Sequence, residues 1–427
     1  MDKKRLNIVQ VAAGLISLHY GLGFLFGTSE AVYQNGISGI TYALMCSFGL
    51  ILLAKLVPFY HKNKLPIWSL FENKYGNSVR NYTVFLSWFW MIGVVASQVI
   101  SSAYIFNLMG FPIIISLLIV IVAVSLISLM CLEKLAKILL YFLIINSSIL
   151  LFCIFSLPKI EINQLLYQLN TIKFSNSSYI SFFSIAIPTV LITLLGMDFH
   201  QFIVKGKNIL VSTKATLLAG SILFFLTLIP SILAIKVRYG NIIPINIDGK
   251  QLIPYTMIFL GENLFGTNLK YFFLTILIIT TVGSCSCLIR IMVQTFQKFE
   301  FIPKQIRKNK KIILVLNGLI IFLLTIKNST LISLIVSFYI IYIVGVLIPF
   351  ITLLFKQQKK FFKSSTIFWS MISGTSVSLI ILVSSKLNLV NIQQPLNLEF
   401  VMLISGIIAS LITLISDKIV QLIFFKN

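Results

Sequence analysis

Residues 14–38 read GLISLHYGLGFLFGTSEAVYQNGIS, an apolar stretch long enough to cross a membrane but interrupted by glycines and polar side chains. A helix in lipid needs about 20 apolar residues and must satisfy its own backbone hydrogen bonds. Ser17, His19, Tyr20, Gly21 and Gly23 are unfavourable on both counts. The stretch therefore predicts a helix that unwinds near the bilayer midplane and faces protein or water. The alternative is a kinked but continuous helix that packs through its small residues.

Composition places the chain in the membrane. Of 427 residues, 58% are hydrophobic and 11% are charged, with 34 Lys and Arg against 11 Asp and Glu. Ordinary soluble domains are far less apolar. The basic residues lie mostly between apolar blocks, not in a soluble segment interleaved with aromatics, so no nucleic-acid partner is expected. These features predict an all-α polytopic protein embedded in a lipid bilayer.

Hydropathy predicts twelve transmembrane helices. They span residues 7–28, 37–58, 81–109, 111–131, 136–157, 178–200, 211–235, 268–294, 310–326, 330–355, 363–384 and 399–424. With a cytoplasmic N-terminus, the inner loops hold about three times as many Lys and Arg as the outer loops, as the positive-inside rule requires. We therefore expect both termini to be cytoplasmic and the location to be a bacterial inner membrane.

The helices divide into two blocks of five and a remainder. We expect a first repeat at 7–157, a second repeat at 178–355 and two accessory helices at 363–424. Each repeat opens on a polar-interrupted segment, and the second one, SFFSIAIPTVLITLLGMDFHQ, is expected to break near Pro188. Because five is odd, the repeats must have opposite orientations, which is the arrangement of many secondary transporters.

Five segments resemble the sodium/solute symporter family. They are GLGFLFGTSEAVYQNGISGITYAL, IWSLFENKYGNSVR, SWFWMIGVVASQVISSAYIF, GMDFHQFIVKGKN and ITTVGSCSCLIRIMVQ, in the order and spacing of that family. The resemblance covers roughly residues 7–355 and implies a LeuT-type fold with a 5+5 inverted repeat. The solute would lie near the midplane between the first, third, sixth and eighth core helices. The chain begins at core helix one, so it resembles a divergent member without the extra N-terminal helix.

The resemblance also implies a sodium site. Its backbone carbonyls would come from Ser17 and Tyr20 in the first core helix, and its two hydroxyls would fall on Gly283 and Ser284 in the eighth. Gly283 lacks a hydroxyl, although Thr280 and Thr281 lie one turn before Ser284. His19 stands where related proline symporters carry an acidic residue. These departures predict weak sodium binding and a proton at His19, unless His19 is a neutral, hydrogen-bonded side chain.

The solute contacts are expected on the same helices. Gly21 and Gly23 flank the break, and Gln98, Ser101 and Ser102 lie near one side of the third predicted helix. The function predicted is secondary active transport of a small polar or anionic solute, coupled to Na+ or H+. The alternative is a transporter-like sensor or binding protein that does not transport. No catalytic constellation at membrane depth predicts an enzyme, no cofactor is expected, and the sequence leaves the oligomeric state open.

Two further regions carry polar groups outside the expected sodium and solute sites. Glu30 and the segment 236–267 are expected at the outer side, where the segment is a candidate gate or a solvated loop. Asp198 and Gln201 are expected to cap or brace the inner junction after the sixth predicted helix.

Overall fold

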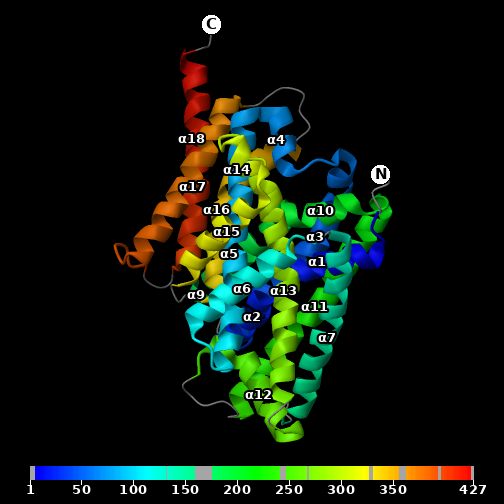
Figure 1. Ribbon diagram of the computed structural model, residues 1–427. Helices are drawn as coiled ribbons and strands as arrows, with labels where there is room; N and C mark the ends of the chain where they lie inside the picture. The colour runs from blue at the N-terminus through cyan, green and yellow to red at the C-terminus, as the bar shows by residue number, and fades with distance from the viewer. Residues whose placement is uncertain are drawn as a thin grey trace.

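The computed structural model describes residues 5–130, 132–158, 176–240, 247–266, 269–326, 330–354, 362–392 and 396–424. Within these ranges the chain is helical (Figure 1). Its elements are α1 (Ile8–His19), α2 (Leu22–Asn35), η1 (Gly36–Ile40), α3 (Thr41–Asn63), α4 (Ile67–Tyr75), α5 (Asn77–Leu108), α6 (Ile113–Ile127), α7 (Leu132–Ser156), α9 (Asn176–Leu195), α10 (Met197–Lys205), α11 (Ile209–Gly240), η2 (Gly249–Gln251), α12 (Leu252–Phe265), α13 (Leu269–Phe296), α14 (Lys304–Lys308), α15 (Lys310–Thr325), α16 (Leu331–Leu354), α17 (Ser364–Lys386) and α18 (Leu398–Phe424).

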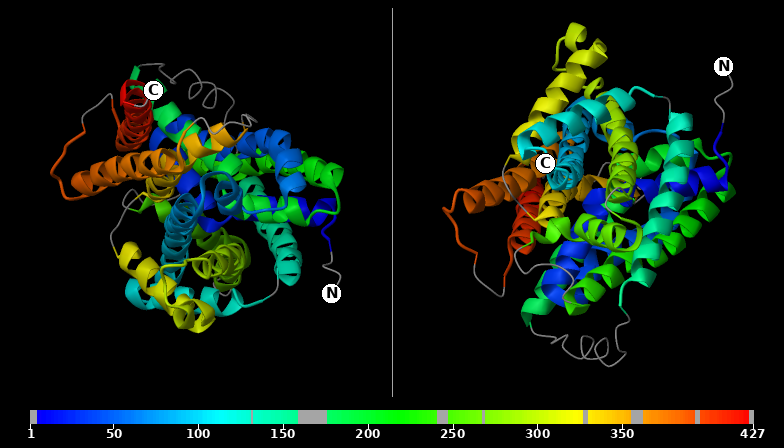
Figure 2. Two further views of the ribbon diagram at one scale, coloured as in Figure 1. Left: turned by 90° about the horizontal axis from the view of Figure 1, so that it is seen from above. Right: turned by 60° about the horizontal axis from the view of Figure 1, so that its bottom comes forward.

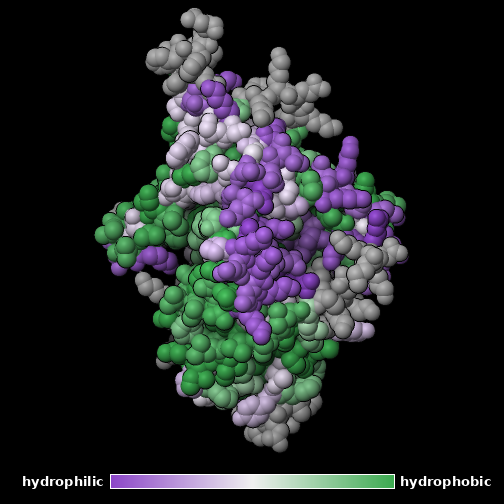
Figure 3. All heavy atoms as spheres, turned by 45° about the horizontal axis from the view of Figure 1, so that its top comes forward, coloured by the Kyte–Doolittle hydropathy of each residue, from purple (hydrophilic) through white to green (hydrophobic). Residues whose placement is uncertain are grey.

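A helix occupies each of the twelve predicted ranges, which confirms an all-α polytopic membrane protein. In the described part of the chain, seven spans are individually long and apolar enough to cross a membrane, or eight when α9 and α10 count as one bent span. The remaining predicted ranges hold α1, α6, α7 and α15. Hydrophobic side chains cover a broad flank of the molecule, and hydrophilic ones gather toward one end (Figure 3).

The broken first segment lies inside the bundle. Helix α1 packs against α7, α10 and α11, and α2 packs against α5, α11 and α16. Helices α17 and α18 pair with each other and lie against α16 at one edge of the bundle (Figures 1 and 2). The division of the chain into segments 7–157, 178–355 and 363–424 stays a prediction.

A capping box fixes the start of α1. The Asn7 side chain accepts the Gln10 amide at 2.9 Å, and the Gln10 side chain accepts the Asn7 amide at 3.1 Å. Just before it, the Leu6 amide donates to the Lys205 carbonyl at the end of α10, at 2.9 Å. These bonds fix the entry of α1 beside the end of α10, so the two broken segments are tied together at one side.

Elements from two predicted inner loops and from one predicted outer segment lie at opposite ends of the bundle. Helices α4 and α14, from predicted inner loops, lie at one end in Figure 1, and α12, from the predicted outer segment 236–267, lies at the other. The hydrophobic side of α12 is buried, with Leu252, Ile253 and Met257 fully packed. Helix α12 is therefore part of the protein core at that end, not a solvated loop.

The second break is at Gly196, so the predicted break near Pro188 is wrong. Helix α9 runs through Pro188 to Leu195, and α10 starts at Met197 with a bend of 40°. Next to the proline, the Thr189 hydroxyl donates to the Ile185 carbonyl at 2.6 Å, which helps the helix to tolerate it. At Gly196 a Cβ would lie 2.7 Å from the Ile192 carbonyl oxygen, so only glycine fits the turn.

Candidate functional site

The first segment is interrupted at Tyr20 and Gly21, as its sequence predicts. Helix α1 ends at His19, Tyr20 has ψ 56°, and Gly21 is extended with φ −101° and ψ 178°. No amide of the described backbone bonds to the carbonyls of Ser17 or Leu18, because the Gly21 amide turns to the His19 carbonyl at 2.8 Å. The break therefore leaves carbonyl oxygens at the end of α1 open to a ligand.

The start of α2 offers the opposite polarity. The amides of Leu22, Gly23 and Phe24 have no hydrogen-bond partner among the described residues, since Gly21 provides no side-chain cap. Unpaired amides at a helix N-terminus carry partial positive charge and suit an anionic or polar group. Carbonyl oxygens at the end of α1 and amides at the start of α2 thus lie next to each other in the core.

The two glycines at the break allow other helices to approach closely. A Cβ on Gly21 would lie 2.9 Å from the Gln98 amide of α5 and 2.9 Å from the Ser284 hydroxyl of α13. A Cβ on Gly23 would lie 2.5 Å from the Ser97 hydroxyl. The Ser284 hydroxyl donates to Gln98 Oε1 at 2.9 Å, and both side chains are buried. The structure therefore brings together three predicted solute residues, Gly21, Gly23 and Gln98, and one predicted cation residue, Ser284.

The other two residues expected on α5 bond within their own helix. The Ser101 hydroxyl donates to the Ser97 carbonyl at 2.9 Å, and the Ser102 hydroxyl donates to the Gln98 carbonyl at 2.8 Å. Both side chains are fully buried. Ser101 and Ser102 lie one turn beyond Ser97 and Gln98, the α5 residues beside Gly21 and Gly23. The two serines are therefore on the same helix but do not contact these glycines.

Buried side-chain oxygens lie on α1 and α7, and only the two residues on α7, Asn146 and Ser147, were not predicted from the sequence. The Tyr20 hydroxyl lies beside the Ser147 hydroxyl of α7, and Ser17 shares the Tyr20 side of α1. Next to Ser147 is Asn146, which is 0% exposed. Among the described residues, Ser17 Oγ, the Tyr20 hydroxyl, Ser147 Oγ and both ends of the Asn146 amide lack hydrogen-bond partners of good geometry. We call Ser17, Tyr20, Asn146 and Ser147 the α1–α7 oxygen cluster.

Unpaired buried polar groups are costly, typically by about 1–3 kcal/mol each. Several of them on two packed helices indicate a place built for a polar occupant, and hydroxyl, amide and carbonyl oxygens are the ligands of hard cations. A signal was present in the sequence. The polar run Asn146–Ser148 interrupts the apolar helix YFLIINSSILLF.

Four residues of α13 were predicted to lie at the cation site, and the structure describes the burial of two of them. Gly283 and Ser284 are buried. The side chains of Thr280 and Thr281 lie outside the described residues.

His19 contacts the second broken segment. Its ring lies 4.7 Å from the ring of Phe199 in α10, tilted by 32°, and is 4% exposed. Its Nε2 has no hydrogen-bond partner in the described part of the protein. The ring is therefore packed as an aromatic side chain between the two breaks.

The second break is closed by side chains, unlike the first. The Tyr60 hydroxyl donates to the Leu194 carbonyl at 2.7 Å, and His200 Nε2 lies 3.2 Å from the same oxygen. The Tyr342 hydroxyl donates to the Leu195 carbonyl at 2.9 Å. The carbonyls of Leu194 and Leu195 at the end of α9 are thus occupied by side chains of the protein itself.

A polar contact joins α2, α5 and η2 on the predicted outer side of the first break. The Lys250 ammonium lies 3.5 Å from the Asp248 carboxylate and 5.5 Å from the centre of the Tyr104 ring. The Tyr104 hydroxyl donates to Asp248 at 3.2 Å. Glu30, which is 4% exposed, accepts the Leu331 amide at 3.4 Å, and a Cβ on Gly249 would touch it at 3.1 Å. We call Glu30, Tyr104, Asp248 and Lys250 the outer polar contact.

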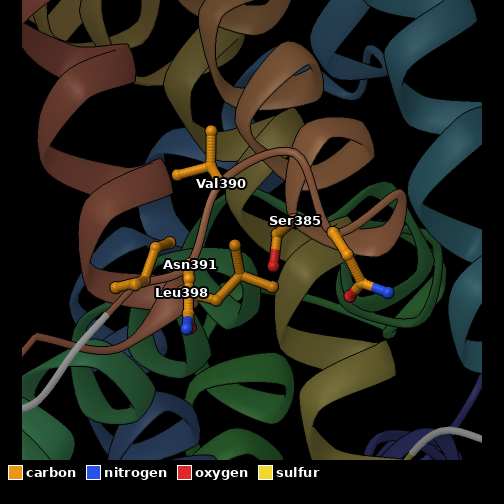
Figure 4. A pocket seen from close by; sticks show the side chains of 6 residues that line it. Ser385, Val390, Asn391 and Leu398 are labelled. Atoms are coloured by element: carbon orange, nitrogen blue, oxygen red, sulfur yellow. The ribbon is translucent and has the colours of Figure 1, made fainter.

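A pocket of about 400 Å³ lies elsewhere, at the connection between α17 and α18 (Figure 4). It is lined by Ser385, Asn388, Val390, Asn391, Ile392 and Leu398. None of these residues belongs to the break or to the predicted site.

Comparison with known proteins identifies the fold as a transporter fold. No protein-family model matches the chain, and no curated protein matches it in sequence. Among solved structures, it is similar to a Na+-coupled sialic acid symporter in a substrate-bound outward-open state, with a TM-score of 0.71 and 13% identity over 96% of this chain and 89% of the symporter. It is also similar to a mutant form of a manganese transporter of Eremococcus coleocola, with a TM-score of 0.62 and 12% identity over 97% and 94% of the two chains.

These similarities define the class of the molecule. The protein is an integral membrane protein with a transporter fold. At this level of identity the likeness extends to the fold alone.

Proposed function

We propose that the protein is a cation-coupled secondary active transporter for a small polar or anionic solute, and a divergent member of the sodium/solute symporter family. The observation that carries the proposal is the break at Tyr20 and Gly21. There, open carbonyls, open amides and unpaired side-chain oxygens meet within a transporter fold. The structural neighbours, both transporters, also favour transport over an enzyme activity.

The solute is placed on the α2 side of the break. Open amides of Leu22, Gly23 and Phe24 suit an anionic or polar group, and Gln98 adds an amide that donates and accepts hydrogen bonds.

The coupling ion is placed on the α1 side of the break. The α1–α7 oxygen cluster consists of hydroxyls and an amide, which are neutral ligands of a hard cation. The predicted sodium site on α1 and α13 lacks a hydroxyl at Gly283 and includes no ligand from α7. Because Asn146 and Ser147 offer oxygens from α7, we propose that Na+ binds in this cluster.

A transporter-like binding protein is the second candidate. The hydrogen bond from Ser284 to Gln98 favours it, because these side chains fill the space beside Gly21 in the described conformation. A transporter must move them when a solute enters, whereas a binding protein needs no passage to the other side.

Reconstituted proteoliposomes separate the two. The purified protein is tested with a panel of radiolabelled amino acids, sugars and carboxylates, under an imposed Na+ gradient, an imposed pH gradient or neither. The transporter accumulates a solute above its equilibrium level only under a cation gradient, and a gradient-dissipating ionophore abolishes the accumulation. Saturable binding of a panel member without accumulation or counterflow would instead establish the binding protein.

A further inference from the structure

Asp198 is a carboxylate buried at membrane depth with no role in the site described above. It lies in the first turn of α10, directly after the break at Gly196, and is 2% exposed. Its Oδ1 has no hydrogen-bond partner among the described residues. Ionisable side chains inside a membrane are costly and mark ion or proton pathways when they persist.

The backbone is shaped around this carboxyl group. A Cβ on Gly196 would lie 2.7 Å from Asp198 Oδ1, so the glycine leaves the space that the oxygen occupies. The amides of Asp198 and Phe199 lie against the carboxyl group. The N-terminus of α10 stabilises the carboxylate, whereas burial away from water stabilises the neutral acid. The two effects thus act in opposite directions on the protonation of Asp198.

One face of α10 leads from Asp198 toward the inner side. Asp198, Gln201 and Lys205 follow each other at spacings of three and four residues, so they share one helical face. Asp198 is buried, and Gln201 and Lys205 are partly exposed. The Nε2 of Gln201 also has no hydrogen-bond partner in the described part of the chain. The face is thus polar over its length and meets solvent at its far end.

The surrounding groups come from six helices, α10 itself included. The titratable or charged ones are His19 of α1, Tyr60 of α3, His200 and Lys205 of α10, Cys287 and Arg290 of α13, and Tyr339 and Tyr342 of α16. Helix α11 contributes the Ser212 hydroxyl, which donates to the Ile203 carbonyl at 2.8 Å. The Arg290 guanidinium donates to the Met130 carbonyl. Within the described residues no salt bridge to Asp198 is formed.

We propose that Asp198 is a proton-binding site of the transport cycle, exchanging its proton with the inner solution along the Gln201 and Lys205 face of α10. The inference rests on the proposed function and adds a proton to the Na+ placed in the α1–α7 oxygen cluster. Only the O–H bond of the carboxyl group forms and breaks. A carboxyl group becomes neutral when it takes up a proton. The His19 imidazole would instead become positively charged beside Phe199, which is costly for a buried side chain.

Infrared difference spectroscopy of the purified protein during a pH titration tests the site without any solute. The wild type is expected to show the carbonyl band of a carboxylic acid that titrates, and Asp198→Asn is expected to lose that band. Asp417→Asn, the same change on α18, is the matched control and should keep it. An unchanged titrating band in Asp198→Asn would overturn the proposal.

A transport measurement separates proton binding from a purely structural role. In proteoliposomes, Asp198→Asn should lose accumulation driven by a pH gradient by about tenfold or more while counterflow continues, and Asp198→Glu should restore the pH response. Accumulation that follows the pH gradient equally in wild type and Asp198→Asn would contradict the inference. If the wild type moves no solute, the proposed function fails, and the infrared titration still decides whether Asp198 binds a proton.

Discussion

At the scale of single residues, glycine decides what the first break can do. Gly21 is extended, and its missing side chain lets Gln98 and Ser284 come within 2.9 Å of the Cβ position. A side chain there would push α5 and α13 away and would favour a continuous helix over a broken one. The same argument applies to Gly23, which meets Ser97.

Gly21→Leu and Gly23→Leu are therefore expected to abolish uptake while the protein still inserts into the membrane. The control is Gly318→Leu in α15, where an added Cβ meets only an Ile121 methyl at 3.1 Å. Solute uptake in proteoliposomes and the yield of monodisperse protein are measured side by side. Normal uptake by both variants would show that the glycines serve packing alone.

At the scale of elements, the outer polar contact joins α2, α5 and η2. Separating η2 from α5 breaks the hydrogen bond from Tyr104 to Asp248 and moves the ammonium of Lys250, which is 5% exposed, away from the Tyr104 ring. We infer that the described conformation is closed on the outer side. Opening has to move η2 away from Tyr104 and Glu30.

Lys250→Gln should open the outer side more often. Thr28, which is 0% exposed and lies just below Glu30 on α2, is changed to cysteine as a reporter. Its labelling by an impermeant thiol reagent should become about fivefold faster with Lys250→Gln, which corresponds to about 1 kcal/mol. The control is Lys386→Gln, at the end of α17. Equal labelling rates in all backgrounds would mean that the contact does not hold the outer side closed.

Elements also show where reasoning from sequence succeeds. The first break was predictable because glycines and polar side chains coincide in one apolar segment. The second was misplaced because Pro188 is a strong local signal, whereas the turn at Gly196 depends on a close contact with the Ile192 carbonyl and Asp198. Asn146 and Ser147 were missed because the sequence does not show which helix packs against this polar run. Only the structure shows that α7 packs against α1.

At the scale of the whole molecule, charge asymmetry predicts the orientation. Asn63 and Asn263 are exposed at the predicted inner and outer ends, and the described native cysteines Cys46, Cys153, Cys285 and Cys287 are buried. In intact cells an impermeant thiol reagent should label Asn263→Cys, and it should label Asn63→Cys only after permeabilisation. The reverse pattern would place the termini outside.

The central claim, that the first break and the α1–α7 oxygen cluster hold the coupling cation, is tested most directly by binding of radioactive Na+ to the purified protein. The wild type should bind Na+ saturably, and Asn146→Leu, which removes an amide at nearly constant volume, should bind it about tenfold more weakly or worse. The control is Asn317→Leu, a similarly buried asparagine of α15 that accepts a hydrogen bond from the Trp88 indole N–H at 2.9 Å. Its Na+ affinity should match the wild type. Absence of saturable Na+ binding in the wild type, or equal affinity in Asn146→Leu, would contradict the account.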